Sequence, residues 1–352
     1  MSTGTASSSR EGASTKNQAE LRVGVVGAGL MGADHVTRIT HRISGAAVTA
    51  VVEPDPGRAG AAAATATGAR TFARLEDALD ADALDAVLVA TPGRYHEAVL
   101  LPALEAGLPV LCEKPLAPDP ESSWRVLQAE QKLDRPHIQV GFMRRFDPEY
   151  QALRELIASG DAGELTMLRC VHRNPAVPDS FTQQMLVNDS VVHEFDVVPW
   201  LAGSDVRSVE VKYPRRNRLS PAHLREPILV IMELANGVLV DVELNVSVQF
   251  GYQVATEAVF DSGLARIGQP SGLQTWRDGR FSVPDHTSFK TRFATAFEAQ
   301  VQRWVDAVGR GTIDGPNAWD GYRVALACEA GVKALDGGVV PVEIPERPAF
   351  YA

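Results

Sequence analysis

Short apolar runs alternate with helix-like stretches between residues 21 and 141 of the chain. Short, mainly apolar runs of this kind, bounded by turn residues, are typical of strands that are buried on both faces of a parallel sheet. The runs cover residues 23–26, 48–52, 86–90, 110–112 and 138–140.

Helical stretches lie between these runs, over residues 58–67 and 97–106 and from the N-cap pair Asp119-Pro120 to Leu133. Strands that alternate with helices favour a parallel sheet covered on both faces. Residues 21–141 are therefore predicted to form a doubly wound Rossmann domain of the α/β class.

The pattern changes after Gly141 to longer strands with a period of two. Every second position is apolar between residues 240 and 250, with polar residues between. Asn236-Gly237 is typical of a type I′ turn and predicts antiparallel pairing with residues 228–234. Helical spacing predicts two closing helices, over residues 293–308 and 319–335. Residues 142–352 are thus expected to form an α+β domain with a large open, mostly antiparallel sheet.

Composition narrows the class of protein. The chain has 352 residues, 45% of them hydrophobic, a net charge of −10 and three distant cysteines without a CxxC pair. No apolar run approaches the roughly 20 residues of a membrane helix, and the negative charge disfavours general nucleic-acid binding. Residues 1–20 are poor in apolar side chains, so a disordered tail without a secretory signal, and a cytoplasmic protein, are expected.

A glycine-rich segment, GAGLMG over residues 27–32, follows the first predicted strand and opens a helix. In that context the spacing lets backbone N–H groups approach a pyrophosphate; a flexible turn is the alternative for such glycines alone. Glu53 ends the second strand, about 20 positions further on, where an acidic residue accepts hydrogen bonds from an adenosine ribose and repels a 2′-phosphate. The pattern favours NAD over NADP.

Lys114 follows the apolar run 110–112, within Glu113-Lys114-Pro115, at the sheet edge where open α/β sheets bind ligands. A lysine at this place could hold substrate hydroxyls beside a nicotinamide. An ordinary exposed lysine is the alternative.

Asp189 and His193 are four positions apart in a stretch, residues 188–201, that predicts a helix, so their side chains share one face. A carboxylate beside an imidazole fixes its tautomer and prepares it as a general base. Two alternatives stay open: a surface ion pair, and a zinc site with His172 as the third ligand. Hydride transfer beside a lysine needs no metal, so we expect none.

The remaining basic groups receive plainer interpretations. Arg144-Arg145 and the cluster over residues 215–218 are expected to be solvated surface. His35 and His41 fall in the first helix and are expected to be structural or exposed.

From about residue 21 to its end, the chain resembles the glucose-fructose oxidoreductase, inositol dehydrogenase and rhizopine catabolism family. GAGLMGADH over residues 27–35 and CEKPL over 112–116 mark the whole family. More particular to its inositol dehydrogenases are GFMRRFD over 141–147, HRNP over 172–175 and GPNAWDGY over 315–322, and DSVVHEFD over 189–196 also matches.

The resemblance implies an NAD-dependent enzyme, a homotetramer, that oxidises a ring hydroxyl of myo-inositol to the 2-keto product, with the hydride passing to nicotinamide C4. Its implied catalytic residues are Lys114, Asp189 and His193, with His193 taking the proton. Its implied cofactor-binding residues are Gly27, Gly29, Leu30, Met31, Gly32, Glu53, Thr91, Glu113 and Lys114. Its implied substrate-binding residues are Arg144, His172, Asn174 and Tyr252.

Two other functions stay open at this point. One is a dehydrogenase of the same family that acts on scyllo- or D-chiro-inositol or on an aldose. The other is an NAD-binding regulator without catalysis, which would need the glycine loop and Glu53 but not the catalytic set. At Glu53 the inositol enzymes commonly have Asp, which leaves the strength of the NAD preference open.

Overall fold

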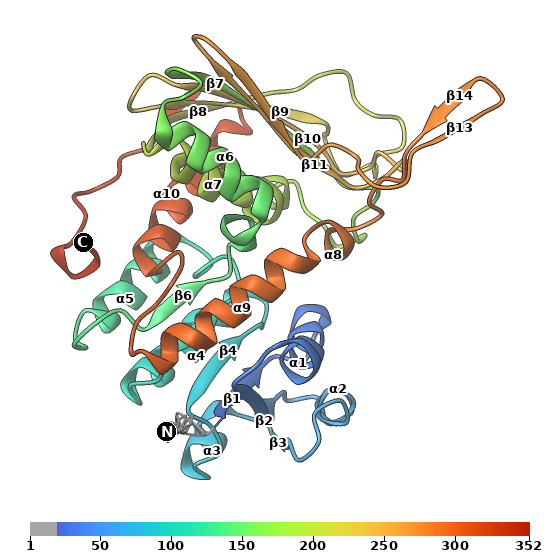
Figure 1. Cartoon of the computed structure of the whole chain (residues 1–352). Helices are drawn as coiled ribbons and strands as arrows, with labels where there is room; N and C mark the ends of the chain where they lie inside the picture. The colour runs from blue at the N-terminus through green and yellow to red at the C-terminus, as the bar shows by residue number, and fades with distance from the viewer. Residues whose placement is uncertain (1–19) are drawn as a thin grey trace, which may run out of the picture.

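The structure is a computed structural model that describes residues 20–352, so the predicted tail lies, but for Glu20, outside the described residues. Six parallel strands form one sheet in the order β3-β2-β1-β4-β5-β6 (Figure 1). The strands are β1 (Leu21–Val26), β2 (Ala46–Val52), β3 (Arg70–Phe72), β4 (Ala86–Val89), β5 (Val110–Cys112) and β6 (Ile138–Val140). This order is that of a dinucleotide-binding Rossmann sheet, as predicted. The three-residue β3 is the strand that the apolar pattern does not predict.

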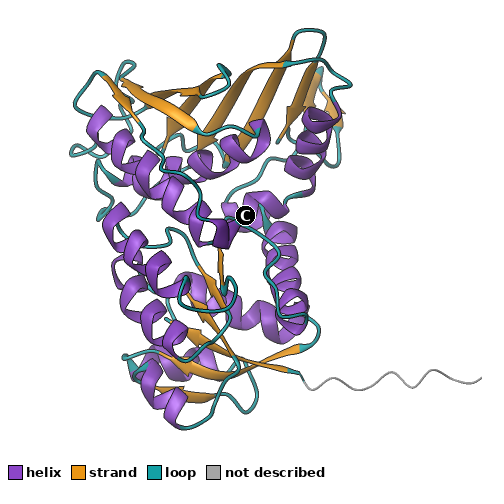
Figure 2. Cartoon of the chain, turned by 90° about the vertical axis from the view of Figure 1, so that its left-hand side faces the viewer, coloured by secondary structure: helices purple, strands orange, loops and turns teal. Residues whose placement is uncertain are grey.

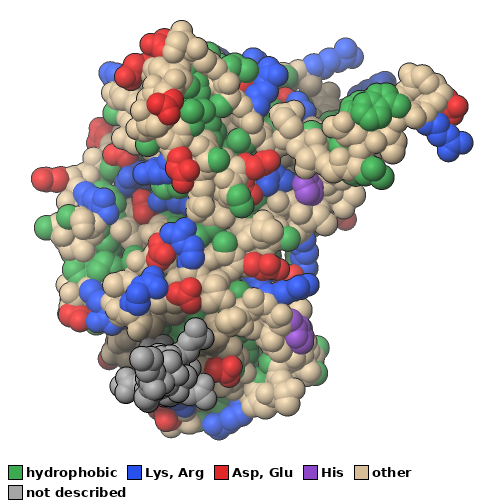
Figure 3. Space-filling model, in the orientation of Figure 1, with side chains coloured by type: hydrophobic (Ala, Val, Ile, Leu, Met, Phe, Trp, Pro, Cys, Tyr) green, Lys and Arg blue, Asp and Glu red, His purple; other side chains and the backbone are tan. Residues whose placement is uncertain are grey.

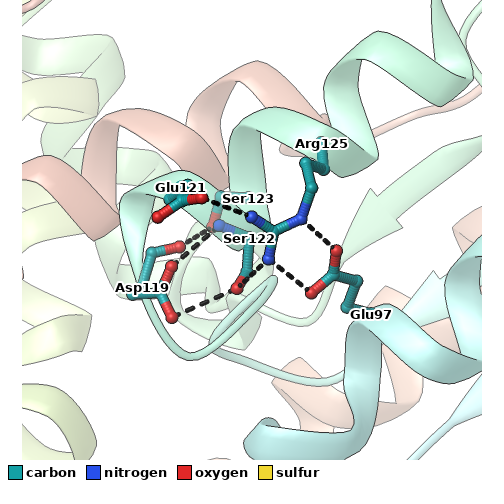
Figure 4. A network of polar contacts seen from close by, with 6 residues as sticks. All are labelled: Glu97, Asp119, Glu121, Ser122, Ser123 and Arg125. Atoms are coloured by element: carbon teal, nitrogen blue, oxygen red, sulfur yellow. Dashed lines mark hydrogen bonds and ion pairs between the residues drawn. The ribbon is translucent and has the colours of Figure 1, made fainter.

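The helices of this domain begin at the residues that local chemistry favours. They are α1 (Leu30–Arg42), α2 (Pro56–Ala63), α3 (Leu75–Asp80), the short η1 (Gly93–Tyr95), α4 (His96–Glu105) and α5 (Pro120–Glu130). The predicted cap of α5 is confirmed, because Asp119 Oδ1 accepts the Ser122 N–H at 2.7 Å. Arg125 then ties α5 to α4 by donating to both carboxylate oxygens of Glu97, at 2.5 and 2.9 Å (Figure 4).

A second sheet of seven strands has the order β12-β11-β7-β10-β9-β8-β15. Its strands are β7 (Leu165–Arg173), β8 (Val206–Lys212), β9 (Ile228–Leu234), β10 (Leu239–Asn245), β11 (Gln253–Phe260), β12 (Leu264–Ile267) and β15 (Val339–Pro341). β7 and β10 run parallel and the other neighbours antiparallel, which confirms the mostly antiparallel sheet.

The hairpin predicted at Asn236-Gly237 is confirmed, but the predicted turn type, I′, is wrong. β9 and β10 pair antiparallel, and Leu234 N–H donates to Val238 O at 3.0 Å. Gly237 has a φ of +86°, whereas Asn236 does not have a positive φ. The loop therefore has three residues, with Gly237 alone left-handed, and a type I′ turn would need both central residues there.

Helices cover one face of the second sheet, and no element of residues 20–352 covers its other face (Figures 1 and 2). The helical segments are η2 (Met143–Phe146), α6 (Pro148–Ser159), the π-helical η3 (Leu186–Val191), α7 (Val192–Ala202), α8 (Phe289–Arg292), α9 (Ala294–Gly309), α10 (Ala318–Ala334) and η4 (Ala349–Tyr351). A hairpin of β13 (Thr275–Arg277) and β14 (Arg280–Ser282) projects beside this sheet. None of the helices in residues 20–352 combines the length and apolarity that crossing a membrane requires.

The two parts of the chain share their packing. Val301, Trp304 and Val305 of α9 join the core that β1, β2 and α1 form on one face of the parallel sheet. Val140 N–H donates to Pro316 O at 2.8 Å, just before α10. The chain thus returns to the first domain after the predicted boundary at Gly141, because α9 packs on the parallel sheet.

Candidate active site

A cavity of about 300 Å³ lies where the loop after β5 meets α1, β7 and α7. Nine of the predicted site residues line it: Leu30, Met31, Glu113, Lys114, His172, Asn174, Asp189, His193 and Tyr252. Four further lining residues were missed by the sequence reasoning: Met143, Ser190, Phe289 and Phe297. A cavity of this size suits a small ligand and part of a cofactor.

The glycine loop leaves room for a phosphate beside its backbone. Gly27 has a φ of +92°, and a Cβ there would lie 2.8 Å from the Thr91 backbone nitrogen. A Cβ at Gly32 would overlap the Gly27 carbonyl oxygen, whereas one at Gly29 would meet nothing within 4 Å. The first and third glycines are therefore needed for packing, and Gly29 opens the loop toward a ligand.

Thr91 and Glu53 lie at the ends of the strands beside this loop. The Thr91 hydroxyl is buried without a hydrogen-bond partner among residues 20–352. Glu53 is 7% exposed, and its Oε2 accepts the Ala28 N–H of the loop at 2.9 Å. Burial raises the pKa of the Glu53 carboxyl, but bonds from Arg58 and the backbone outweigh burial and lower it. These features fit the adenosine and pyrophosphate parts of NAD.

Glu113 is bound to His35, which is a structural residue as expected. Arg38 Nη1 donates to His35 Nδ1 at 3.1 Å, so the ring proton lies on Nε2 and is donated to Glu113 Oε1 at 2.7 Å. Burial raises the pKa of Glu113, but His35 and Lys114 outweigh it and lower the pKa, so the group is a carboxylate. Its Oε2 accepts the Lys114 N–H at 3.3 Å, which connects α1 to the lysine loop.

Lys114 is held by Asp189. Its Nζ donates to the backbone oxygen and to Oδ1 of Asp189, both at 2.9 Å, and its side chain is 18% exposed. The Lys114 charge lowers the pKa of the Asp189 carboxyl. An ammonium group has three donors, so one remains for a ligand.

The predicted contact between Asp189 and His193 is wrong. No hydrogen bond joins the two side chains in the described part of the chain, and the carboxylate is engaged by Lys114. Asp189 lies in the π-helical η3 and His193 in α7, which starts at Val192. The Asp189 carboxylate binds Lys114, which comes from the loop after β5, and spacing along one helix does not reveal such a partner.

His193 faces the cavity with its ring free of hydrogen bonds within residues 20–352. Burial, and then the charges of Lys114 and Arg144, lower the pKa of this imidazole well below its usual 6.5. The ring is therefore neutral at pH 7 and able to accept a proton.

Behind the cavity, Arg144, Glu194 and His172 form a buried cluster, each exposed by 3% or less. Arg144 donates to Glu194 Oε1, and His172 Nδ1 lies 3.2 Å from both Arg144 Nη2 and Glu194 Oε2. Burial raises the pKa of Glu194, but Arg144 and His172 outweigh it and lower the pKa to about 2. The cluster fixes the His172 ring, leaving its Nε2 for a ligand.

The prediction that Arg144-Arg145 is solvated is wrong. Arg144 is 1% exposed, and Arg145 donates to Asp196 from inside the protein. Buried partner carboxylates in α7, far along the sequence, explain the difference. Arg144 does not line the cavity and supports His172 from behind, whereas Arg215, Arg216 and Arg218 are exposed as predicted.

Asn174 and Tyr252 complete the polar wall. Asn174 Oδ1 is buried without a partner among the described residues, and it follows directly on β7. The Tyr252 ring stands edge-on to His172, with centroids 6.4 Å apart. Burial raises the pKa of the Tyr252 hydroxyl, so it stays protonated and can donate. The unpaired amide oxygen of Asn174 and the hydroxyl donor of Tyr252 suit a ligand rich in hydroxyl groups.

The zinc alternative has little support in this geometry. Asp189 is engaged by Lys114, and His172 Nδ1 by the cluster behind it. Over residues 20–352, no group of three His, Cys, Asp or Glu side chains could hold a metal ion.

Of the missed lining residues, Phe289 and Phe297 come from the segment around α8 and the start of α9. Their rings meet edge-on, with centroids 6.3 Å apart, and Phe297 also packs against His35. Helical spacing marked Phe297 as a core residue, and nothing in the local pattern shows that this core borders a cavity. Met143 and Ser190 lie beside predicted residues, Arg144 and Asp189.

Comparisons with known proteins agree with this geometry. Residues 21–142 match the family model described as an oxidoreductase family with an NAD-binding Rossmann fold, and residues 150–266 match the GFO/IDH/MocA C-terminal domain. The inositol 2-dehydrogenase of Corynebacterium glutamicum is 70% identical over 333 residues, which are 94% of this chain and 99% of that protein. The amino-terminal domain is therefore an NAD-binding Rossmann domain.

Two solved structures are similar over almost the whole chain. The myo-inositol dehydrogenase from Lactobacillus casei, in complex with NAD(H) and myo-inositol, has a TM-score of 0.92 and 31% identity, covering 95% of this chain and 100% of that one. The scyllo-inositol dehydrogenase of the same organism has a TM-score of 0.85 and 28% identity, covering 92% and 99%.

Proposed function

The chain belongs to the GFO/IDH/MocA oxidoreductase family, whose amino-terminal domain is described as an NAD-binding Rossmann fold, and from that premise we propose that it oxidises one ring hydroxyl of myo-inositol to the 2-keto product. The observation that carries the proposal is the cavity beside the glycine loop. It combines a neutral imidazole, an anchored ammonium and an unpaired amide oxygen. The relatives named for inositol dehydrogenation support myo-inositol as the substrate.

His193 is the proton acceptor in this proposal. Its neutral ring takes the hydroxyl proton as the C–H bond breaks, and bound NAD supplies the hydride acceptor at nicotinamide C4. Proton removal by a positioned base contributes about a hundred- to ten-thousand-fold to a rate.

Lys114 polarises the reacting oxygen with the donor that Asp189 leaves free. Because both Asp189 contacts are 2.9 Å long, the ammonium group is held in one place before substrate arrives. Asp189 is thus proposed to position Lys114, and this differs from the role beside His193 that the spacing suggested. Positioning of this kind lowers the entropic part of the barrier.

His172, Asn174 and Tyr252 are proposed to bind the other ring hydroxyls. His172 is fixed by Glu194 and Arg144, and Asn174 offers its unpaired Oδ1. A site built to pair with hydroxyls discriminates strongly against a ring that lacks them, because its own buried groups would then stay unpaired.

The test is the initial rate of NADH formation with a panel of polyols. We expect the highest kcat/KM with myo-inositol, and lower values with scyllo-inositol, D-chiro-inositol and aldoses. A higher kcat/KM with one of these compounds would identify that compound as the substrate, and the chain would still be a dehydrogenase of the same family. NAD binding without NADH formation on any of them would favour the non-catalytic regulator.

The proposal includes a homotetramer in the cytoplasm. The uncovered face of the seven-stranded sheet and the exposed side chains of its projecting hairpin support self-association. Cys112, Cys170 and Cys328 are buried and unpaired, which suits a reducing compartment.

A further inference from the structure

The carboxylate that ends β2 is already occupied on most of its sides. Glu53 Oε2 accepts from Ala28 N–H at 2.9 Å, and Oε1 accepts from Asp55 N–H at 3.1 Å and from Arg58 Nη2 at 2.7 Å. An ionised carboxylate has about four acceptor positions. One position is therefore left for an adenosine ribose, whereas a free carboxylate could bind both ribose hydroxyls.

Arg58 is placed to meet the same ribose. Asp55 Oδ1 caps α2 by accepting the Arg58 N–H at 2.8 Å, so the first turn of α2 directs this side chain back to β2. The guanidinium is 57% exposed, and Glu53 uses one of its five N–H donors. Its Nη1 lies 3.9 Å from Asp55 Oδ2, which is beyond hydrogen-bond distance.

These two groups have opposite effects on a phosphate at the ribose 2′ position. A carboxylate at this place repels a 2′-phosphate, and an arginine nearby accommodates one. In this chain both are present and bound to each other, so the Arg58 guanidinium offsets the charge of Glu53.

We propose that Arg58 sets the cofactor specificity of this chain: by binding Glu53 and offering its free donors outward, it lets the site accept NADP beside NAD. This inference rests on the proposed function only in that the cofactor binds in the Rossmann domain. NAD remains the preferred cofactor, because the ionised Glu53 still repels a 2′-phosphate.

Binding of two adenosine fragments to the full chain tests this without any substrate. Isothermal titration calorimetry gives the Kd of adenosine 2′,5′-bisphosphate and of 5′-AMP for the natural chain, for Arg58→Gln and for Arg42→Gln. Arg42 is a matched control, because it is an exposed arginine of the same domain, in the last turn of α1.

We expect the natural chain to bind both fragments. Arg58→Gln should weaken bisphosphate binding relative to 5′-AMP by about tenfold, the effect of losing a charge-assisted hydrogen bond. Arg42→Gln should leave the ratio of the two Kd values unchanged. The proposal is overturned if Arg58→Gln leaves that ratio unchanged, or if the natural chain binds 5′-AMP and not the bisphosphate.

Turnover gives a second readout. The ratio of kcat/KM with NAD to kcat/KM with NADP should rise about tenfold in Arg58→Gln and fall in Glu53→Gln. Equal ratios in all three proteins would also overturn the proposal. If instead the inositol assignment is wrong, the protein will not turn over inositol with either cofactor. Arg58→Gln will still change the ratio of the Kd values of the two fragments.

Discussion

At the scale of single residues, the proposed chemistry depends most on His193. Replacing it with alanine removes the base and leaves the glycine loop and Glu53 untouched, so turnover should fall about a hundred- to ten-thousand-fold. The Kd of NAD should change little. Steady-state rates and NAD titration by protein fluorescence measure the two effects. His41→Ala, an exposed histidine of α1, is the control and should keep normal turnover. Normal turnover in His193→Ala would show that another group takes the proton.

The pH dependence of the reaction follows from the same residue. Burial and the charges of Lys114 and Arg144 lower the pKa of His193 well below 6.5, and only the neutral ring can accept a proton. The value of kcat/KM should therefore stay constant as the pH falls from 8 to about 6.5 and decline only below it, as the ring becomes protonated. Rates measured in buffers of constant ionic strength would show this acid limb. A decline with a midpoint above pH 7 would contradict the assignment.

At the scale of secondary-structure elements, the link between α1 and β5 supports the site. His35 donates a buried hydrogen bond to Glu113, so His35→Ala leaves that carboxylate oxygen without its partner and should lower the free energy of unfolding by about 1–3 kcal/mol. Denaturant unfolding measures this loss, with His41→Ala again as the control.

A double variant separates stability from positioning. His35→Leu with Glu113→Met replaces the pair by apolar groups and should recover most of the lost stability. Turnover of the double variant should be lower than that of the natural chain, because the backbone N–H of Lys114 has lost the Glu113 oxygen to which it donates. Full recovery of turnover in the double variant would show that the pair has no positioning role.

The same scale shows what the sequence can and cannot predict. Apolar runs and caps predicted the Rossmann strands and the start of α5, because those signals are local. The exposed three-residue β3 has no such run, and η3 reads as ordinary helix because a π-helical turn changes spacing without changing composition. The position of α9 on the parallel sheet depends on contacts between residues more than 200 positions apart in the sequence. A local repeat of apolar residues does not reveal such contacts.

In the candidate site, too, some residues could be predicted from local signals and some contacts could not. Lys114 and the glycine loop were found because chain order places them at a sheet edge. The partner of Asp189 was mistaken, since spacing identifies neighbours along one helix and the true partner comes from another element. The link from Glu53 to Arg58 also needs side-chain geometry, although the two residues are only five positions apart.

At the scale of the whole molecule, the projecting hairpin exposes apolar side chains that the rest of the described chain does not cover. All six residues of β13 and β14 are exposed, and the projecting arm carries hydrophobic side chains on its surface (Figure 3). The rings of Trp276 and Phe281 lie tilted to each other with centroids 5.0 Å apart, and the two residues are 72% and 54% exposed. An isolated two-stranded hairpin is marginally stable in water. We therefore expect the hairpin to pack on a second copy of this chain in the proposed tetramer.

Light scattering after size-exclusion chromatography tests this expectation. The double variant Trp276→Ser with Phe281→Ser should shift the tetramer toward smaller species, because the contact loses its apolar area. Arg277→Ser changes the same strand at a charged and even more exposed position, so it should keep the tetramer. A natural chain that runs as a monomer would contradict the tetramer itself. A tetramer that survives the double variant would place the contact elsewhere, and the uncovered face of the seven-stranded sheet would then be the surface to change.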